Sequence, residues 1–232
     1  MEIARRRNQC VACRPKAFEF VRQQLERLDT TTGLVHAVLG VSMHALDDAQ
    51  PEALDAQFDA LAARVLSQCR RATPTALVTH LHDVLFEQDR FAGPPQERYY
   101  NPLNSYLPTV LGLRHGLPIT LGLVYKAVAE RVGLEVEGIS SRGHFLVRVH
   151  DGRGWLIVDP FHGGRVLTMP QACAMVSQIV GEPLQPSEAH LPIATHKQWL
   201  LRVIVNLAQV FEAMRKPHDL QAMHEMAALV LR

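Results

Sequence analysis

The sequence predicts an α+β fold in which a small antiparallel sheet is flanked by helices. Apolar residues recur at helical spacing in the first ninety residues and again after residue 195. Between residues 134 and 158 the pattern changes to short runs rich in β-forming residues. The turn sequence Asp151-Gly152-Arg153-Gly154 separates two of these runs. Helices grouped around a short meander of strands are typical of the α+β class.

Composition limits the size and the class of the protein. The 232 residues are 47% hydrophobic and 20% charged, which suits one globular domain or one domain with a helical appendage. The net charge of +1 gives no electrostatic reason to expect nucleic acid or a membrane surface as a partner. No apolar run reaches 18 residues and residues 1–16 lack the core of a signal peptide. We therefore expect a cytoplasmic protein.

The N-terminal part is predicted to be a flexible arm (1–14) followed by a helical region (15–90). Thr30-Thr31-Thr32-Gly33 is interpreted as a break between the first two helices. The third helix has the clearest amphipathic pattern, and Thr73-Pro74 marks the start of the fourth. The predicted helices cover residues 16–28, 34–46, 52–70 and 74–86.

A further helix is predicted from Pro118 to Val132. Proline suits the first turn of a helix, where its missing N–H has no intrahelical partner to lose. Gly133 stands where a glycine commonly ends a helix. A shorter helix is predicted to begin at Asn104-Ser105.

Three strand-like runs follow this helix, and the second and third place one histidine near one aspartate. The first carries Leu134, Val136 and Ile139, the second begins at His144, and the third, after the turn, ends at Asp159. A fourth short strand is predicted at residues 165–167. If the two strands pair about the turn, the start of one lies beside the end of the other. A carboxylate beside an imidazole can fix its tautomer and stabilise its charged form.

Four segments together resemble a known family. They read YYNPLNSYLPTVL, GLPITLGLVY, GHFLVRV and DPFHGG, and they are similar to the SirB-type branch of transglutaminase-like proteins. The resemblance is strongest from Phe86 to Thr168. It implies a papain-like core, placed at residues 91–180, in which Cys, His and Asp act together. Gly116, His144, Trp155 and Asp159 fall on the pattern of that core.

The chain departs from the catalytic pattern at one position. Pro118 stands where the core has its nucleophilic cysteine. Removing the nucleophile from a working triad costs about a millionfold in turnover. The resemblance therefore implies a vestigial His144–Asp159 dyad in a protein that is a pseudoenzyme of the superfamily.

Other residues are candidates for a binding role. Tyr99 and Tyr100 either line the vestigial site or anchor their loop by ring burial. Asn104 is either a helix cap or a polar contact beside the site. Thr120 offers a hydroxyl, and His162 follows the second strand closely enough to lie nearby.

The cysteines indicate neither a metal centre nor a cofactor. Cys10 and Cys13 form a lone C-x-x-C, while a structural zinc site needs four ligands. Cys69 lies on an amphipathic helix and is assigned to packing. Cys173 lies in the middle of a predicted helix, away from the helix N-terminus that would activate a thiol, so it is assigned to the core. We expect no metal and no cofactor.

The C-terminal part is predicted as a linker (181–194) and a helical hairpin (195–232). The hairpin resembles one tetratricopeptide-like repeat. A single repeat buries its apolar face only by stacking on something else. Two alternatives remain: the hairpin packs on the core, or it completes a homodimer.

Three functions fit the sequence. The first is a non-catalytic module that binds a protein or peptide partner in a cleft beside Pro118, His144 and Asp159. The second is a weak hydrolase or amidase that uses the dyad as a general base on water or on a substrate hydroxyl. The third is an assembly protein that binds through its helical surface.

Overall fold

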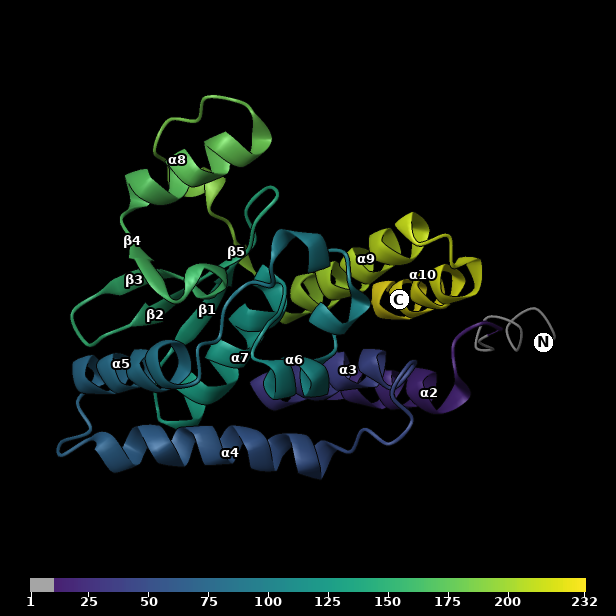
Figure 1. The fold of residues 1–232 in the computed structure, drawn as a ribbon, viewed down its shortest axis with the longest axis horizontal. Coiled ribbons are helices and arrows are strands. Elements are labelled where there is room, and N and C mark those ends of the chain that lie inside the picture. Colours follow the sequence, from purple (N-terminus) through teal and green to yellow (C-terminus); the bar gives the residue numbers. More distant parts are fainter. Residues whose placement is uncertain (1–10) are drawn as a thin grey trace.

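The computed structural model describes residues 11–232, in which nine α-helices surround one five-stranded sheet (Figure 1). This arrangement confirms the predicted α+β class. None of the described helices combines the length and the apolar character needed to cross a membrane. The helices are α2 (Pro15–Gln24), α3 (Thr31–Ser42), α4 (Pro51–Gln68), α5 (Pro74–His82), α6 (Leu107–Leu113), α7 (Pro118–Arg131), α8 (Met169–Val180), α9 (His196–Ala213) and α10 (Pro217–Leu231).

Proline and threonine mark where the helices begin. Seven of the nine described helices have a proline in the first turn. A backbone N–H at this place has no intrahelical acceptor, so proline loses no hydrogen bond there. The other two, α3 and α9, are capped by Thr30 and Thr195. The predicted break between the first two helices is present, but it falls at residues 28–30 and not across Thr31–Gly33. The Thr30 hydroxyl accepts a hydrogen bond from the N–H of Gly33 at 3.0 Å, so the threonines start α3.

The sheet is antiparallel throughout, with strand order β4-β3-β2-β1-β5. Four strands were predicted, and the fifth lies inside the segment predicted to be a linker. Two residues carry too little pattern to identify a strand, and β5 is defined only by its pairing with β1. The strands are β1 (Val136–Ile139), β2 (Leu146–His150), β3 (Trp155–Asp159), β4 (Arg165–Leu167) and β5 (Ile193–Ala194).

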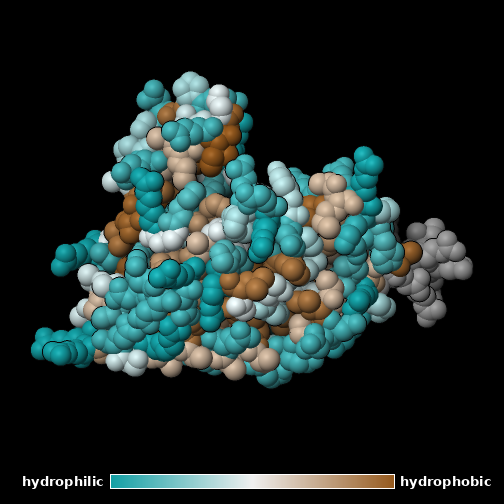
Figure 2. Space-filling view, viewed as in Figure 1, coloured by the Kyte–Doolittle hydropathy of each residue, from teal (hydrophilic) through white to brown (hydrophobic). Residues whose placement is uncertain are grey.

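The two faces of the sheet belong to two separate cores. Phe145, just before β2, and Val147 and Val149 on it alternate along the chain and pack into the main core with α7 and with Trp199 of α9. Leu146, on the opposite face, joins a smaller core with α8 residues, including the fully buried Cys173. In Figure 1, α8 stands away from the body beyond β4, and Figure 2 shows hydrophobic residues where this part meets the strands.

The C-terminal hairpin packs on the core of the same chain. Helix α9 contacts α3, α7 and β5, and α10 contacts both α9 and α2. Trp199 of α9 is fully buried, and its indole N–H donates to the carbonyl of Ile119 at 3.1 Å. Of the two predicted alternatives, packing of the hairpin on the core is therefore the one that the structure shows.

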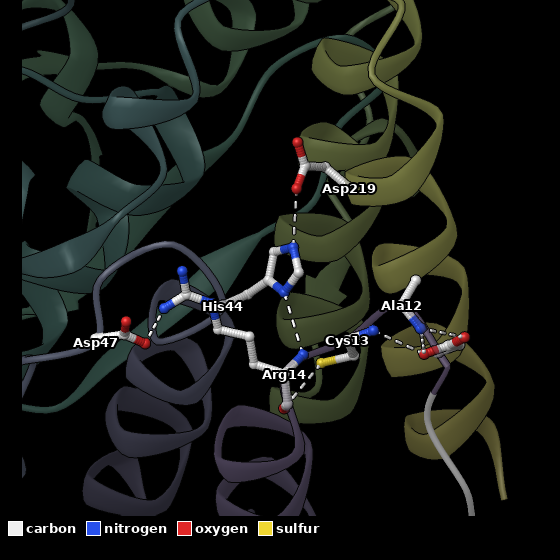
Figure 3. A network of polar contacts seen from close by, with 7 residues as sticks. Ala12, Cys13, Arg14, His44, Asp47 and Asp219 are labelled. Carbon is white, nitrogen blue, oxygen red and sulfur yellow. Dashed lines mark hydrogen bonds and ion pairs between the residues drawn. The ribbon is translucent and has the colours of Figure 1, made fainter.

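The described part of the predicted N-terminal arm is attached to α10. The backbone N–H groups of Val11, Ala12 and Cys13 donate to the carboxylate of Glu225 at 2.9–3.2 Å. Ala12 and Cys13 are buried, and Figure 3 shows them beside α10. The prediction of a loose arm was wrong for these residues, because their partner lies more than 200 residues away in the sequence. Residues 1–10, and with them Cys10, lie outside the described part of the chain.

Candidate functional site

Helix α7 presents Pro118 at its first turn. Leu117 caps the helix with extended backbone and Pro118 follows as the first helical residue. Both side chains are buried. The N-terminus of a helix favours a thiolate, which is why a nucleophile would be effective at this position. The ring of Pro118 offers no group that can attack a substrate.

His144 and Asp159 meet at the ends of two paired strands, as the sequence predicts. Gly143, with a left-handed φ of +73°, makes the turn that leads into His144 just before β2. Strands β2 and β3 pair with Val147 opposite Val158, which brings the start of β2 to the end of β3. The Nε2 atom of His144 lies 3.1 Å from both carboxylate oxygens of Asp159. Both residues are buried, at 5% and 1% exposure.

A second imidazole contacts the same carboxylate. His162 lies in the short 3-10 turn Pro160–His162, and its Nδ1 is 2.7 Å from Oδ2 of Asp159. The backbone N–H groups of Phe161 and His162 donate to Oδ1 at 3.1 and 3.3 Å. The sequence placed His162 near the site but did not show that it shares the partner of His144.

The contacts with the two imidazoles lower the pKa of the Asp159 carboxyl group. Burial alone would raise the pKa of this carboxyl group, because it penalises the charged form. Hydrogen bonds and favourable charge interactions with His144 and His162 outweigh the burial, and the pKa of Asp159 lies below its ordinary value. Asp159 is therefore an anion at neutral pH, held between two imidazoles.

The cleft at the start of α7 contains His144 but not its aspartate. It has a volume of about 380 Å³. Tyr99, Tyr100, Pro118 and His144 line it together, so the structure brings four of the predicted site residues to one place. Its other lining residues are Leu117, Ile119, Gly143, Phe145, Arg202, Val205, Asn206, Gln209 and Val210.

One wall of the cleft comes from α9, which sequence reasoning missed. Arg202 donates to the carbonyl oxygens of Ser141 and His144 and to the hydroxyl of Ser140 at 2.7–2.9 Å. These bonds fix the turn that carries His144. Burial lowers the pKa of Arg202 from its very high ordinary value. Nothing in the local sequence of α9 distinguishes Arg202 from the other arginines of the chain.

Asn104 holds the tyrosine loop and caps no helix. Its side-chain amide donates to the carbonyls of Arg98 and Tyr99 at 2.6 and 3.1 Å. Its own carbonyl accepts from the N–H of Leu117, directly before Pro118. The predicted cap was wrong because α6 begins only at Leu107. Asn104 connects the loop to the start of α7 from outside the cleft lining.

Thr120 and Tyr99 complete the account of the predicted residues. Thr120 is fully buried, outside the cleft lining, and its hydroxyl has no hydrogen-bond partner among the described residues. Tyr99 is half-buried, with its ring edge-on to those of Tyr100 and Phe161. Burial, together with the neighbouring Tyr100, raises the pKa of Tyr99. Tyr99 therefore does both things that were predicted as alternatives: its ring packs within the loop, and it lines the cleft.

A second cavity lies on the other side of the dyad. Asp159 and His162 line it together with Arg165, Gln178 and other residues, and its volume is about 550 Å³. The three hydrogen-bonded side chains of His144, Asp159 and His162 thus connect the cleft at the start of α7 with this second cavity. A larger cavity of about 650 Å³ faces β3 and β4, but its one arginine, Arg148, is already paired with Glu137.

No described thiol faces His144. Cys173 is buried in the smaller core, and neither Cys13 nor Cys69 lines the cleft. The hydroxyl of Ser141 donates to the carbonyl of His144 and not to its ring. Within residues 11–232 the imidazole therefore has a carboxylate partner and no partner that can act as a nucleophile.

Comparison with known proteins agrees with this architecture. Residues 52–205, more than half of the chain, match the family described as the transglutaminase-like superfamily. The match begins at α4 and ends within α9, so it includes both the dyad and the wall of the cleft that contains Arg202.

Two groups of proteins are similar to the chain. A UPF0162 protein of Xylella fastidiosa is 38% identical over 130 residues, which are 55% of this chain and 46% of that protein. A UPF0162 protein of Pseudomonas aeruginosa is 31% identical over 50% of this chain and 42% of its own length. F-box only protein 21 of Mus musculus is 31% identical over 53% of this chain and 20% of its own length. Each match therefore spans less than half of the relative. No solved structure matches the chain significantly.

Proposed function

Because the chain belongs to the transglutaminase-like superfamily, we propose that it uses the superfamily cleft to bind a peptide segment without forming a covalent intermediate. The observation that carries the proposal is the pairing of Pro118 and His144 in one cleft with no described thiol. Acyl transfer in such a site needs an activated nucleophile beside the imidazole. Without that nucleophile, the cleft can bind a peptide but lacks the group that a covalent step needs.

The chemistry of the cleft suits a peptide. Tyr100, Asn206 and Gln209 are at least partly exposed, and their phenol and amide groups can hydrogen-bond to peptide amides. Val205 adds an exposed apolar surface next to these groups. The guanidinium of Arg202 already donates to three uncharged groups of the protein, so only part of its hydrogen-bonding capacity remains for a ligand. An uncharged peptide with one apolar side chain fits this lining.

A mixture of N-acetylated, C-amidated hexapeptides with randomised positions tests the proposal. The immobilised full chain should retain a subset that shares an apolar residue, and mass spectrometry should recover those peptides uncut. Gln209→Ala should reduce the retention. Gln178→Ala is the matched control, because Gln178 is also an exposed helical glutamine but lines the other cavity. Equal retention by the wild type and Gln209→Ala, or an empty eluate, would contradict the proposal.

A hydrolytic function is the second candidate, and one observation favours it. Asp159 engages Nε2 of His144, which leaves Nδ1 as the nitrogen that can accept a proton from water. This is the division of roles found in His–Asp dyads that act as general bases. The same peptide mixture distinguishes the two functions. Slow cleavage that disappears in His144→Gln would indicate a hydrolase, and the absence of cleavage would favour binding alone.

The finer family assignment is also a proposal. The sequence segments around Tyr99, Pro118 and Asp159 support the SirB-type branch, and the antiparallel packing of α9 on α10 supports a tetratricopeptide-like hairpin. The division into a helical region, a core at 91–180 and a hairpin stays a prediction. Because the hairpin already packs on α3 and α7, the structure gives no added reason to propose a homodimer.

A further inference from the structure

The imidazoles of His144 and His162 converge on the carboxylate of Asp159, and we propose that these three side chains form a binding site for a divalent cation, best suited to zinc. The three potential ligand atoms are Nε2 of His144, Oδ2 of Asp159 and Nδ1 of His162, and all lie within 4.8 Å of one another. The proposal goes beyond peptide binding and does not depend on it.

The spacing of the ligand atoms is close to that of a metal site. Oδ2 of Asp159 lies 3.1 Å from Nε2 of His144 and 2.7 Å from Nδ1 of His162. A tetrahedral zinc ion with bonds of 2.0–2.1 Å separates its ligand atoms by about 3.3 Å. Nε2 of His144 and Nδ1 of His162 lie within 4.8 Å of each other, so rotation of the side chains has to bring the three atoms to the zinc spacing.

The carboxylate is oriented as a metal ligand should be. Its Oδ1 atom accepts hydrogen bonds from the backbone N–H groups of Phe161 and His162. Those bonds hold the plane of the carboxylate and leave Oδ2 directed at His162. Ligating carboxylates are commonly held in this way by groups outside the metal's own coordination shell.

Access and ligand type both support an ion that keeps an open position. The side chain of His162 is 55% exposed, and it lines the 550 Å³ cavity together with Asp159. Two histidines and one carboxylate are a ligand set used for zinc and for iron(II), with the remaining positions taken by water or a ligand. Arg165 lines the same cavity, and its positive charge weakens the attraction for a cation.

A second cluster with the same ligand types serves as an internal comparison. His44, His218 and Asp219 also lie within 4.8 Å of one another. The backbone N–H of Arg14 donates to Nδ1 of His44, as Figure 3 shows. The proton of the neutral ring is then on Nε2, the atom that faces Asp219 at 3.0 Å. Because Nδ1 of His44 already accepts that bond, the ring proton cannot move there and free Nε2 for a metal. No described group donates to Nδ1 of His144, so its proton can move to Nδ1 and leave Nε2 to the ion. The His44 cluster should therefore not bind the ion.

Titration of the metal-free full chain tests the proposal. The protein is treated with EDTA, dialysed, and titrated with zinc chloride by calorimetry and with cobalt chloride by absorbance. We expect one ion per chain and a tetrahedral cobalt spectrum. His162→Ala should weaken zinc binding by about 100-fold or more, since even groups behind a metal ligand contribute 10–100-fold. His162 is largely exposed, so this variant should keep the fold, and circular dichroism checks that it does.

His218→Ala is the matched control and should bind zinc as the wild type does. His144→Gln should lose binding as His162→Ala does. The proposal is overturned if the wild type binds no zinc, if His162→Ala binds as tightly as the wild type, or if His218→Ala removes the binding. Peptide retention is measured separately with EDTA present, so failure of the metal site leaves the test of the cleft unaffected.

Discussion

The indole N–H of Trp199 donates to the carbonyl oxygen of Ile119 at 3.1 Å, and this bond joins the C-terminal hairpin to the first turn of α7. Ile119 is the residue after Pro118, so the bond lies directly behind the cleft. Trp199 also packs against the ring of Phe145, the residue after His144. One buried side chain therefore supports both elements that present the candidate site.

Replacing Trp199 by Phe should lower the free energy of unfolding by about 1–3 kcal/mol, because a buried hydrogen bond is lost and a cavity is left. Urea denaturation followed by circular dichroism measures the change. Trp155→Phe is the control, since Trp155 is 36% exposed on β3 and should tolerate the substitution. An equal loss of stability in the two variants would contradict this role of Trp199.

Local sequence was sufficient for the elements whose partners lie nearby in the chain. The turn at 151–154 fixes the pairing of β2 and β3, and that pairing brings His144 to Asp159. The start of α7 was readable from Pro118 because the proline itself favours that position. In these cases the interaction that determines the structure lies within about fifteen residues.

Features that depend on distant partners were not predictable. Arg202 bonds to the His144 turn from a helix some sixty residues later, and only tertiary packing turns it toward the cleft. Strand β5 exists because β1 has an open edge, and Ala12 is buried because Glu225 binds its backbone. Hydrophobic periodicity identifies which face of a helix is buried, but it does not identify the segment that the face meets.

Pro118→Cys should create a reactive thiol. A cysteine at the first turn of α7 would combine a helix N-terminus with a nearby imidazole, both of which stabilise a thiolate. At pH 6 we expect alkylation by iodoacetamide at residue 118 to be at least about tenfold faster than in Pro118→Cys/His144→Ala. Peptide mapping by mass spectrometry, with EDTA present, measures the rate at this residue.

The wild type is the background for that experiment. Cys173 is buried in the smaller core and should not be alkylated in the folded protein. If the single and double variants react at the same rate, His144 does not act on the position of Pro118. The inference that this cleft has the arrangement of a cysteine site would then be wrong.

Asn104→Ala should loosen the loop that carries Tyr99 and Tyr100. The substitution removes two hydrogen bonds from a buried amide and leaves the carbonyls of Arg98 and Tyr99 without that donor. We expect a loss of about 1–3 kcal/mol in unfolding free energy and faster hydrogen exchange over residues 98–104. Asn101→Ala is the control, because its side chain accepts only one exposed bond, from Leu103. Unchanged exchange in Asn104→Ala would show that ring packing alone holds the loop.

The attachment of residues 11–13 to α10 should weaken in acid. Burial would raise the pKa of Glu225, but hydrogen bonds from the backbone of Cys13, Ala12 and Val11 lower it below the ordinary 4.5. A carboxyl group with a lowered pKa in the folded state stabilises the fold fully above its unfolded value. That contribution is lost as the pH falls through the folded value.

Glu225→Gln should therefore lower the free energy of unfolding at pH 7. We expect a loss of about 1 kcal/mol, because the site is partly exposed. The variant's stability should also depend less on pH near and below 4.5. Hydrogen exchange of Ala12 and Cys13 and urea denaturation at several pH values measure both effects. Glu182→Gln is the matched control, since the pKa of Glu182 is also lowered, by exposed Arg142, and an exposed ion pair contributes little. If Glu225→Gln leaves the exchange of Ala12 and Cys13 unchanged at pH 7, the carboxylate does not hold this segment, and packing of the two buried side chains accounts for its position.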